Sequence, residues 1–239
     1  MCDAALDKLQ QRIRMSTQSR IGQGVRFLHQ LASDHPGKYW EVLDPQHGDH
    51  RIWPQSQYLI HLTLKRLWSS ELARRVKAAN DFNAPAVDRD ISSNARYCVL
   101  DNDIAPFYLA KQQNSDYFDE VALIGHYWAL AGAMLRAKVL AGSLLQNWNR
   151  SLGVLGMDKD DVQYNLYRIY KTALAGTLFA RVGMLDNCAS TAAKLEQLQG
   201  SDGGWVTDMR PDGSLDGVAN VETTCLALIC LDCSAKGGF

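Results

Sequence analysis

The sequence predicts an all-α protein built from helical hairpins. Apolar residues recur at the three- and four-residue spacing of helices over most of the chain, whereas alternating β-branched runs between tight turns, which would indicate strands, are missing. The 239 residues are 46% apolar, which suits one domain over residues 1–239 with a substantial core. A third observation, the recurrence of similar helix and loop units, indicates repeated hairpins.

Seven segments carry the helical spacing. In chain order they are 4–33 as one or two amphipathic helices, 55–79 as another pair, 104–113, 119–147 as one long or broken helix, 162–182, 186–199 and 221–235. The window from 121 to 145 is long enough to cross a bilayer, but His126, Arg136 and Lys138 interrupt it. We therefore expect buried helix there and no transmembrane segment.

The charge balance argues against nucleic acid as a partner. The formal net charge is −1 and both signs are mixed along the chain, so neither nucleic acid nor an anionic membrane would be attracted by charge. The chain opens on polar residues instead of a signal peptide, and its six cysteines fit reduced thiols. The expected location is cytoplasmic, with peripheral membrane contact and oligomerisation left open.

Two features recur along the chain. The segments GVRFLHQLASDHPGKYW (24–40) and TAAKLEQLQGSDGGW (191–205) both run from helix through Gln-Leu or Leu-Gln and polar residues to Gly and an aromatic ring. Acids also precede three predicted helices, around 101–103, 158–161 and 220–222, at intervals of roughly 60 residues. A repeat of this length would hold an inner helix, an outer helix and a long loop.

One of these segments resembles a known repeat. Gln199, Gly203, Gly204 and Trp205 look like the Gln-Trp repeat of squalene cyclases, protein prenyltransferase β-subunits and their relatives, and the following ANVETTCLALICL is similar to the inner helix that opens the next hairpin there. The resemblance covers 191–233 well and the rest by pattern. It implies an α/α toroid of helical hairpins, and the short chain implies an incomplete or open one.

The resemblance also implies catalytic acids. Terpenoid cyclases that begin by protonation carry Asp-x-Asp-Asp-Thr or Asp-x-Asp-Thr-Thr at such a helix start, and the middle acid donates the proton. Residues 220–224 match in register, with Asn220 replacing the first Asp and Glu222 the middle one, and Asp101 and Asp103 match the first and third positions. The implied catalytic residues are therefore Glu222, Asp103 and Asp101.

Protonating an alkene requires a neutral carboxyl group in a dry cavity. The resulting cation is stabilised by aromatic faces through cation–π contacts. The candidate substrate-binding rings are Tyr97, Phe107, Tyr108, Tyr127, Trp128, Tyr164, Tyr167 and Trp205. The substrate that this chemistry implies is an isoprenoid or a similar apolar small molecule.

Helix capping is the competing interpretation of each acid. Asn220 is a favoured N-cap residue, and an acid in a first turn is stabilised by the helix dipole by about 0.3–1 kcal/mol. Glu222 nevertheless begins the face that carries Leu226, Ile229 and Cys230. In a toroid the amino ends of the inner helices converge, so acids gathered there could raise one another's pKa or bind Mg²⁺. No other cofactor is implied.

Zinc is disfavoured. Residues 186–188, Asp-Asn-Cys, have the first half of the zinc motif of protein prenyltransferases, but no histidine follows His126. Cys230 and Cys233 form a C-x-x-C on a predicted helix without a partner pair, and we interpret them as small buried hydrophobic residues.

Two other functions compete with the cyclase. His47 and His50, with Asp49 between them, could serve as acid and base in a carbohydrate-active α/α barrel, a polysaccharide lyase or glycoside hydrolase. The chain could also be a non-catalytic toroid that binds a peptide or a partner protein. The resemblance favours an enzyme, a cyclase of the isomerase or lyase type.

Overall fold

The structure is a computed structural model that describes residues 2–43, 52, 54–67, 70–80, 94–101 and 115–239. Over these residues the chain is mostly helical, as predicted, with a few short strands. The helices are α1 (Cys2–Gln30), α2 (Pro54–Leu67), α3 (Ser70–Ala79), the 3₁₀ helix η1 (Asn94–Asp101), α4 (Phe118–Leu130), α5 (Met134–Gln146), α6 (Lys159–Tyr164), α7 (Ile169–Arg181), α8 (Leu185–Leu198) and α9 (Val221–Lys236). None of these described helices is long and apolar enough to span a membrane.

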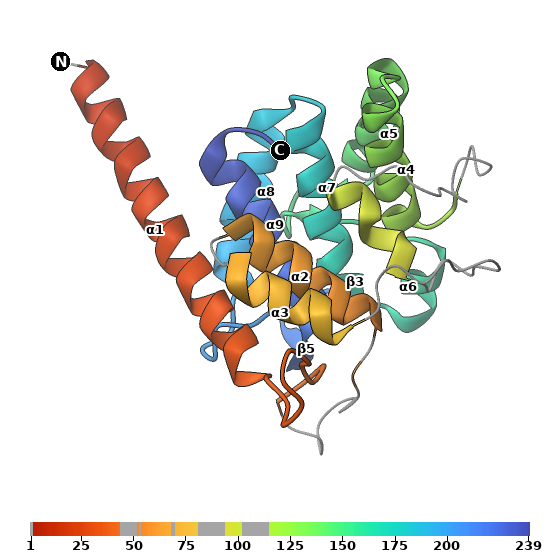
Figure 1. Ribbon diagram of the computed structural model, residues 1–239. Helices are drawn as coiled ribbons and strands as arrows, with labels where there is room; N and C mark the ends of the chain where they lie inside the picture. Colours follow the sequence, from red (N-terminus) through yellow and green to blue (C-terminus); the bar gives the residue numbers. More distant parts are fainter. Residues whose placement is uncertain (1, 44–51, 53, 68–69, 81–93, 102–114) are drawn as a thin grey trace.

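Helix α9 is the centre of the packing. It contacts α1, α2, α7 and α8, and α7 in turn contacts α4 (Figure 1). Residues 223–233 are buried, because every one of them except Asp232 is apolar or small, and Asp232 pairs with Arg66. Helices α2, α4 and α7 each pack against the helix that follows them, α3, α5 and α8, while η1 contacts both α2 and α4.

Two of these hairpins turn in the same way. At the end of α4, Gly132 has φ +80° and the amide of Ala133 donates to the carbonyl of Trp128 at 2.8 Å. At the end of α7, Gly183 has φ +81° and the amide of Met184 donates to the carbonyl of Phe179 at 2.8 Å. Glycine suits both turns, because this left-handed conformation carries no penalty without a side chain. The segment 119–147, predicted as one long or broken helix, is therefore broken into α4 and α5.

Short strands form where the sequence predicts none, in two loops and inside the predicted helix 162–182. That prediction is wrong over 165–168, because Asn165 takes the left-handed conformation and ends the first helix there. β1 (Trp148–Asn149) and β2 (Val154–Leu155) form a hairpin after α5. After α8, β4 (Val206–Met209) and β5 (Leu215–Ala219) form another, and β3 (Tyr167–Arg168) pairs with β4. All of these pairs are antiparallel. Strands of two to five residues are too short to show the alternation by which strands are recognised.

The glycine- and tryptophan-containing loop after α8 joins three helices. Trp205 is fully buried, its indole N–H donates to the carbonyl of Leu195 at 2.8 Å, and its amide donates to the hydroxyl of Thr224 at 3.0 Å. The side chain of Gln199 donates to the carbonyls of Gly203 and of Arg20 on α1. This loop therefore holds α1, α8 and the start of α9 together.

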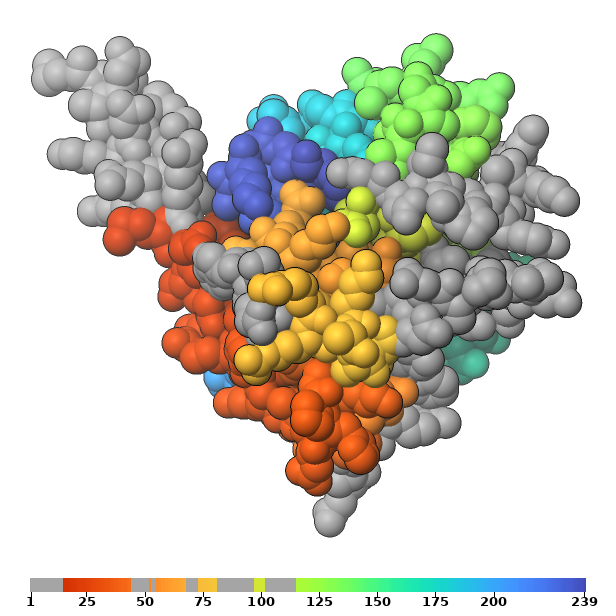
Figure 2. Space-filling view, in the orientation of Figure 1, coloured from red at the N-terminus to blue at the C-terminus, as the bar shows by residue number. Residues whose placement is uncertain are grey.

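The front of the molecule is covered by α2 and α3. In Figure 2 these helices, in orange and yellow, lie at the centre, with the end of α1 and the segment after it below them and the C-terminal residues above. The segment after α1 also reaches α9, since Val42 forms a bridge with Asn220. This contact brings the residues around 41 to the amino end of α9.

Candidate functional site

The amino end of α9 is capped by residues other than Glu222. The side chain of Asn220 accepts a hydrogen bond from the amide of Thr223 at 2.9 Å. Glu41, which is buried, supplies the rest: its carbonyl accepts from the amide of Val221 at 3.0 Å and its carboxylate from the amide of Glu222 at 3.2 Å. These bonds satisfy amides that a helix start leaves without intrahelical partners.

The carboxylate of Glu222 is bound by a tyrosine instead. The hydroxyl group of Tyr97 donates a short hydrogen bond to Oε1 of Glu222. Tyr97 lies on η1 and is fully buried, whereas Glu222 is half-buried. Tyr97 and Glu222, both predicted site residues, therefore meet at one place from sequence positions far apart.

A thiol and a second phenol adjoin this pair, and both are held neutral. The pKa of Cys225 is raised by burial and further by the charges of Glu41 and Glu222. Burial also raises the pKa of Tyr39, and the proximity of Cys225 adds to this. Since a thiol reacts as its thiolate, Cys225 is unsuited to be a nucleophile. The chemistry that this cluster can perform is proton transfer by its carboxylates.

Asp101 does not join this cluster. It is the last residue of η1, and its carboxylate accepts two hydrogen bonds from Lys65, at 2.8 and 2.9 Å. The ammonium group of Lys65 is on an exposed side chain in the last turn of α2. The other predicted acid, Asp103, lies outside the described residues, as do Phe107, Tyr108 and the His47, Asp49 and His50 loop.

The remaining predicted rings lie elsewhere. Tyr127 and Trp128 contact each other edge to face at 5.1 Å near the end of α4, and the guanidinium of Arg136 lies 4.7 Å from the centre of the Trp128 ring. Tyr164 is 61% exposed on α6. The hydroxyl of Tyr167 accepts a hydrogen bond from Asn149 at 2.7 Å. Trp205 is a core residue. Among the predicted rings that the structure describes, Tyr97 is the one that forms a hydrogen bond with Glu222.

A buried lysine with two carboxylates is the group that sequence reasoning missed. Nζ of Lys171, on α7, lies 2.6 Å from Asp158 and 2.9 Å from Asp161, and all three side chains are buried. Asp158 and Asp161 form a capping box at the start of α6, and Asp158 also accepts from the amide of Phe118 at 2.9 Å. The acids at 158–161 therefore hold helix starts together, and the Asp-x-x-Asp spacing is the signal that could have identified them.

These two carboxylates respond differently to their surroundings. Burial acts to raise the pKa of Asp158, but the bonds from Lys171 and from the amide of Phe118 outweigh it, and the pKa is lowered. Burial raises the pKa of Asp161 despite the same lysine. Asp158 is therefore the carboxylate that stays ionised most readily beside the ammonium group.

Histidine and cysteine side chains do not assemble a metal site in the described part of the chain. No group of three or more His, Cys, Asp or Glu side chains is placed to hold an ion there. His126 is fully buried, and its Nε2 lies 3.1 Å from the hydroxyl of Thr177. Cys230 and Cys233 are fully buried thiols in α9, in keeping with their interpretation as small core residues.

Comparison with known proteins does not assign this chain to a family, so a functional assignment rests on the geometry of the residues described above. No protein-family model matches the chain, and no match is found among curated proteins.

Proposed function

We propose that this chain is an acid–base enzyme of the terpenoid cyclase kind, in which Glu222 protonates an isoprenoid or similar apolar substrate. The observation that carries the proposal is the hydrogen bond from buried Tyr97 to Glu222. Because Asn220 and Glu41 already cap α9, capping does not account for the position of this carboxyl group.

The hydrogen bond also favours one arrangement of the acid. With the hydroxyl of Tyr97 donating to Oε1, the proton of a neutral Glu222 would reside on Oε2, the oxygen free to face a substrate. Transfer of that proton to one carbon of an alkene leaves a carbocation on the other and a carboxylate on Glu222. The Tyr97 bond would then stabilise the carboxylate that forms, which is the electrostatic role expected of a preorganised donor.

We propose further that the helices form an α/α toroid, with α2, α4, α7 and α9 as inner helices. Two features support this arrangement. Helix α9 contacts α2 and α7, α7 contacts α4, and η1 contacts α4 and α2. In addition, α5 and α8, which would be outer helices, are each followed by a short β-hairpin; the second leads directly into α9, and α6 and β3 lie between the first and α7. A hairpin of the same type after successive outer helices is typical of repeat proteins, in which each unit has a similar structure.

The test is a substitution that removes the acid and keeps the shape. Glu222→Gln preserves the size of the side chain and an acceptor for Tyr97. The matched control is Asp186→Asn, which changes an exposed acid in the first turn of α8 and so alters the same helix-dipole contact away from the cluster. Each purified variant would be incubated with linear isoprenoid alcohols and hydrocarbons, and cyclic products measured by gas chromatography and mass spectrometry.

We expect the wild-type chain to form cyclic products, Glu222→Gln to lose at least about 100-fold in rate, and Asp186→Asn to match the wild type. Far-ultraviolet circular dichroism would establish that all three are equally helical. Equal rates for Glu222→Gln and the wild type, or no conversion of any isoprenoid by the wild type, would remove the proposal.

A further inference from the structure

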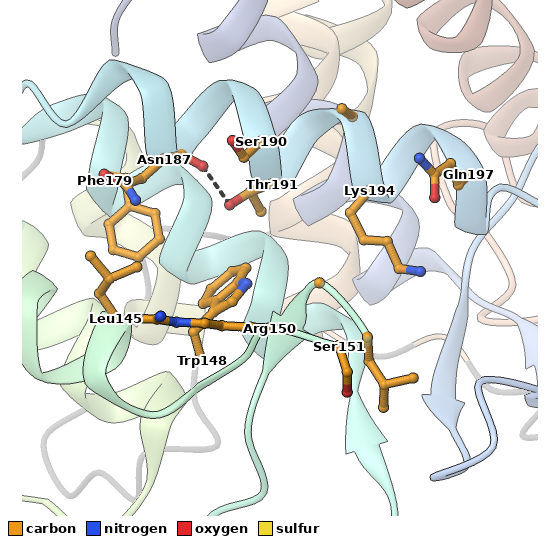
Figure 3. Close-up of a pocket in the computed structure, with 13 residues that line it drawn as sticks. Leu145, Trp148, Arg150, Ser151, Phe179, Asn187, Ser190, Thr191, Lys194 and Gln197 are labelled. Carbon is orange, nitrogen blue, oxygen red and sulfur yellow. Dashed lines mark hydrogen bonds between the residues drawn. The ribbon is translucent and has the colours of Figure 1, made fainter.

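A groove of about 640 Å³ lies between α8 and the β1–β2 hairpin (Figure 3). Its apolar wall includes Leu145 and Trp148, and the Trp148 ring lies 5.8 Å from the buried ring of Phe179. In Figure 3, Ser190 and Lys194 on α8 lie across from Trp148 and the hairpin. The volume falls within the range of about 300–1,000 Å³ typical of small-molecule sites.

The charged side chains of this groove are all cationic. Arg150 and Lys194 line it, and no aspartate or glutamate does. Neither cation forms an ion pair with any residue in the described part of the chain. The neutral polar residues around them include Asn187 and Gln197, which can donate hydrogen bonds. The lining is therefore complementary to negative charge.

Lys194 passes the hairpin turn at a glycine. Gly153 has φ +71°, and a Cβ atom added there would lie 3.5 Å from both Cγ and Cδ of Lys194, so the stem of the lysine runs beside the turn with room for a methyl group between them. A lysine stem placed along protein surface keeps its charged end in the open space beside it. Lys194 thus places a cation in the groove beside the hairpin, and Trp148 lies farther along the same groove (Figure 3).

We propose that this groove binds a small organic anion, a carboxylate or sulfonate attached to a flat apolar body. The body would lie against Trp148 and Leu145, and the anionic group would pair with Arg150 or Lys194. This site shares no residue with the Glu222 and Tyr97 cluster, so it does not depend on the function proposed for that cluster.

The experiment compares two probes of the same shape and different charge. Binding of 2-naphthoate, an anion, and of 2-naphthamide, which is neutral, would be measured by isothermal titration calorimetry on the full chain. The variants are Arg150→Gln and Lys194→Gln, with Arg26→Gln as the control, since Arg26 is an exposed arginine on α1 that does not line the groove.

We expect the wild-type chain to bind 2-naphthoate at least about tenfold more tightly than the amide, because a hydrogen bond to a charged group contributes more than one to a neutral group. Arg150→Gln or Lys194→Gln should weaken naphthoate binding by about tenfold, and Arg26→Gln should not. Failure of 2-naphthoate to bind at millimolar concentration, equal affinity for the amide, or naphthoate binding unchanged in both groove variants would overturn the proposal.

Discussion

At the amino end of α9, three polar side chains accept hydrogen bonds from three different donors. Asn220 caps the amide of Thr223, Glu41 accepts from the amide of Glu222, and Glu222 accepts from Tyr97. Only the first contact can be read from the sequence, because N-capping is local. The other two depend on segments distant in sequence, which explains why capping and acid chemistry were both tenable interpretations of Glu222.

His126 is a second residue whose surroundings change its chemistry. It is fully buried, and burial, with the charges of Arg181 and Arg66, lowers its pKa well below the ordinary 6.5. Arg181 itself is mostly buried under the ring of Phe239, which lies 3.6 Å from its guanidinium, and burial lowers the pKa of Arg181 to about 10. His126 is therefore neutral in the folded protein at neutral pH.

This neutral histidine predicts a pH dependence of stability. Below about pH 6.5 the unfolded chain takes up a proton on His126 and the folded chain does not, so stability is complete above 6.5 and decreases as the pH falls toward the folded pKa. We expect this residue to reduce the free energy of unfolding by up to about 1.4 kcal/mol per pH unit over that window. Urea unfolding of the wild type and His126→Gln from pH 7 to 5 would measure the effect.

The difference between the two proteins is the informative quantity, because it isolates the contribution of His126. His61 also has a pKa lowered by burial, and it is present in both. A slope that is equal in His126→Gln and the wild type would contradict a neutral buried His126.

Among the helices, the starts of α4, α6 and α7 are joined by one ionic cluster. Asp158 accepts from the amide of Phe118 and from Lys171, and Asp161 accepts from Lys171 and from Arg168 at 3.2 Å. A buried charge without its partner is far more costly than an exposed one. The lysine should therefore matter much more to stability than an exposed lysine on the same helices.

Lys171→Met tests this junction. We expect a loss of roughly 3–5 kcal/mol in the free energy of unfolding, because buried Asp158 would lose its counter-charge and buried Asp161 would be left with Arg168. The control is Lys159→Met on α6, where the side chain is 66% exposed and lies 3.9 Å from an exposed Asp116. That change should stay within about 0.5 kcal/mol of the wild type. Chemical denaturation of both variants gives the comparison, and similar losses in the two would contradict the role of the cluster.

The helices were more predictable from the sequence than the contacts between them. Apolar spacing predicts helical segments that the structure confirms, including 186–199 as α8 and 221–235 as α9. It left open whether the helix over 119–147 is broken, since the break depends on the left-handed turn at Gly132, and isolated glycines also occur inside helices, as Gly176 does in α7. Spacing shows which face is apolar but not which partner covers it.

Across the whole molecule, helices approach closely at glycines. A Cβ atom on Gly125 of α4 would lie 2.5 Å from a methyl group of Leu178 on α7, and one on Gly176 would lie 2.5 Å from the sulfur of Cys230 on α9. Gly24 has the same position between α1 and α9, where a Cβ atom would lie 2.8 Å from Leu228. The packing of α1 and α7 against α9, and of α4 against α7, therefore depends on these three glycines.

Helix α1 offers a matched pair of glycines to test this packing. A Cβ atom on Gly24 would also lie 3.0 Å from the ring of Trp205, whereas one on Gly22 has nothing within 4 Å. Both residues lie within the same helix, so Gly→Ala gives each the same gain in helix propensity, roughly 0.5–1 kcal/mol. At Gly22 this gain should appear as added stability in thermal and urea unfolding. At Gly24 the methyl group must displace Leu228 or Trp205, and overpacking of this kind costs typically 1–3 kcal/mol, so we expect a net loss. Equal stabilisation by both substitutions would mean that α1 does not pack on α9 at Gly24 in solution.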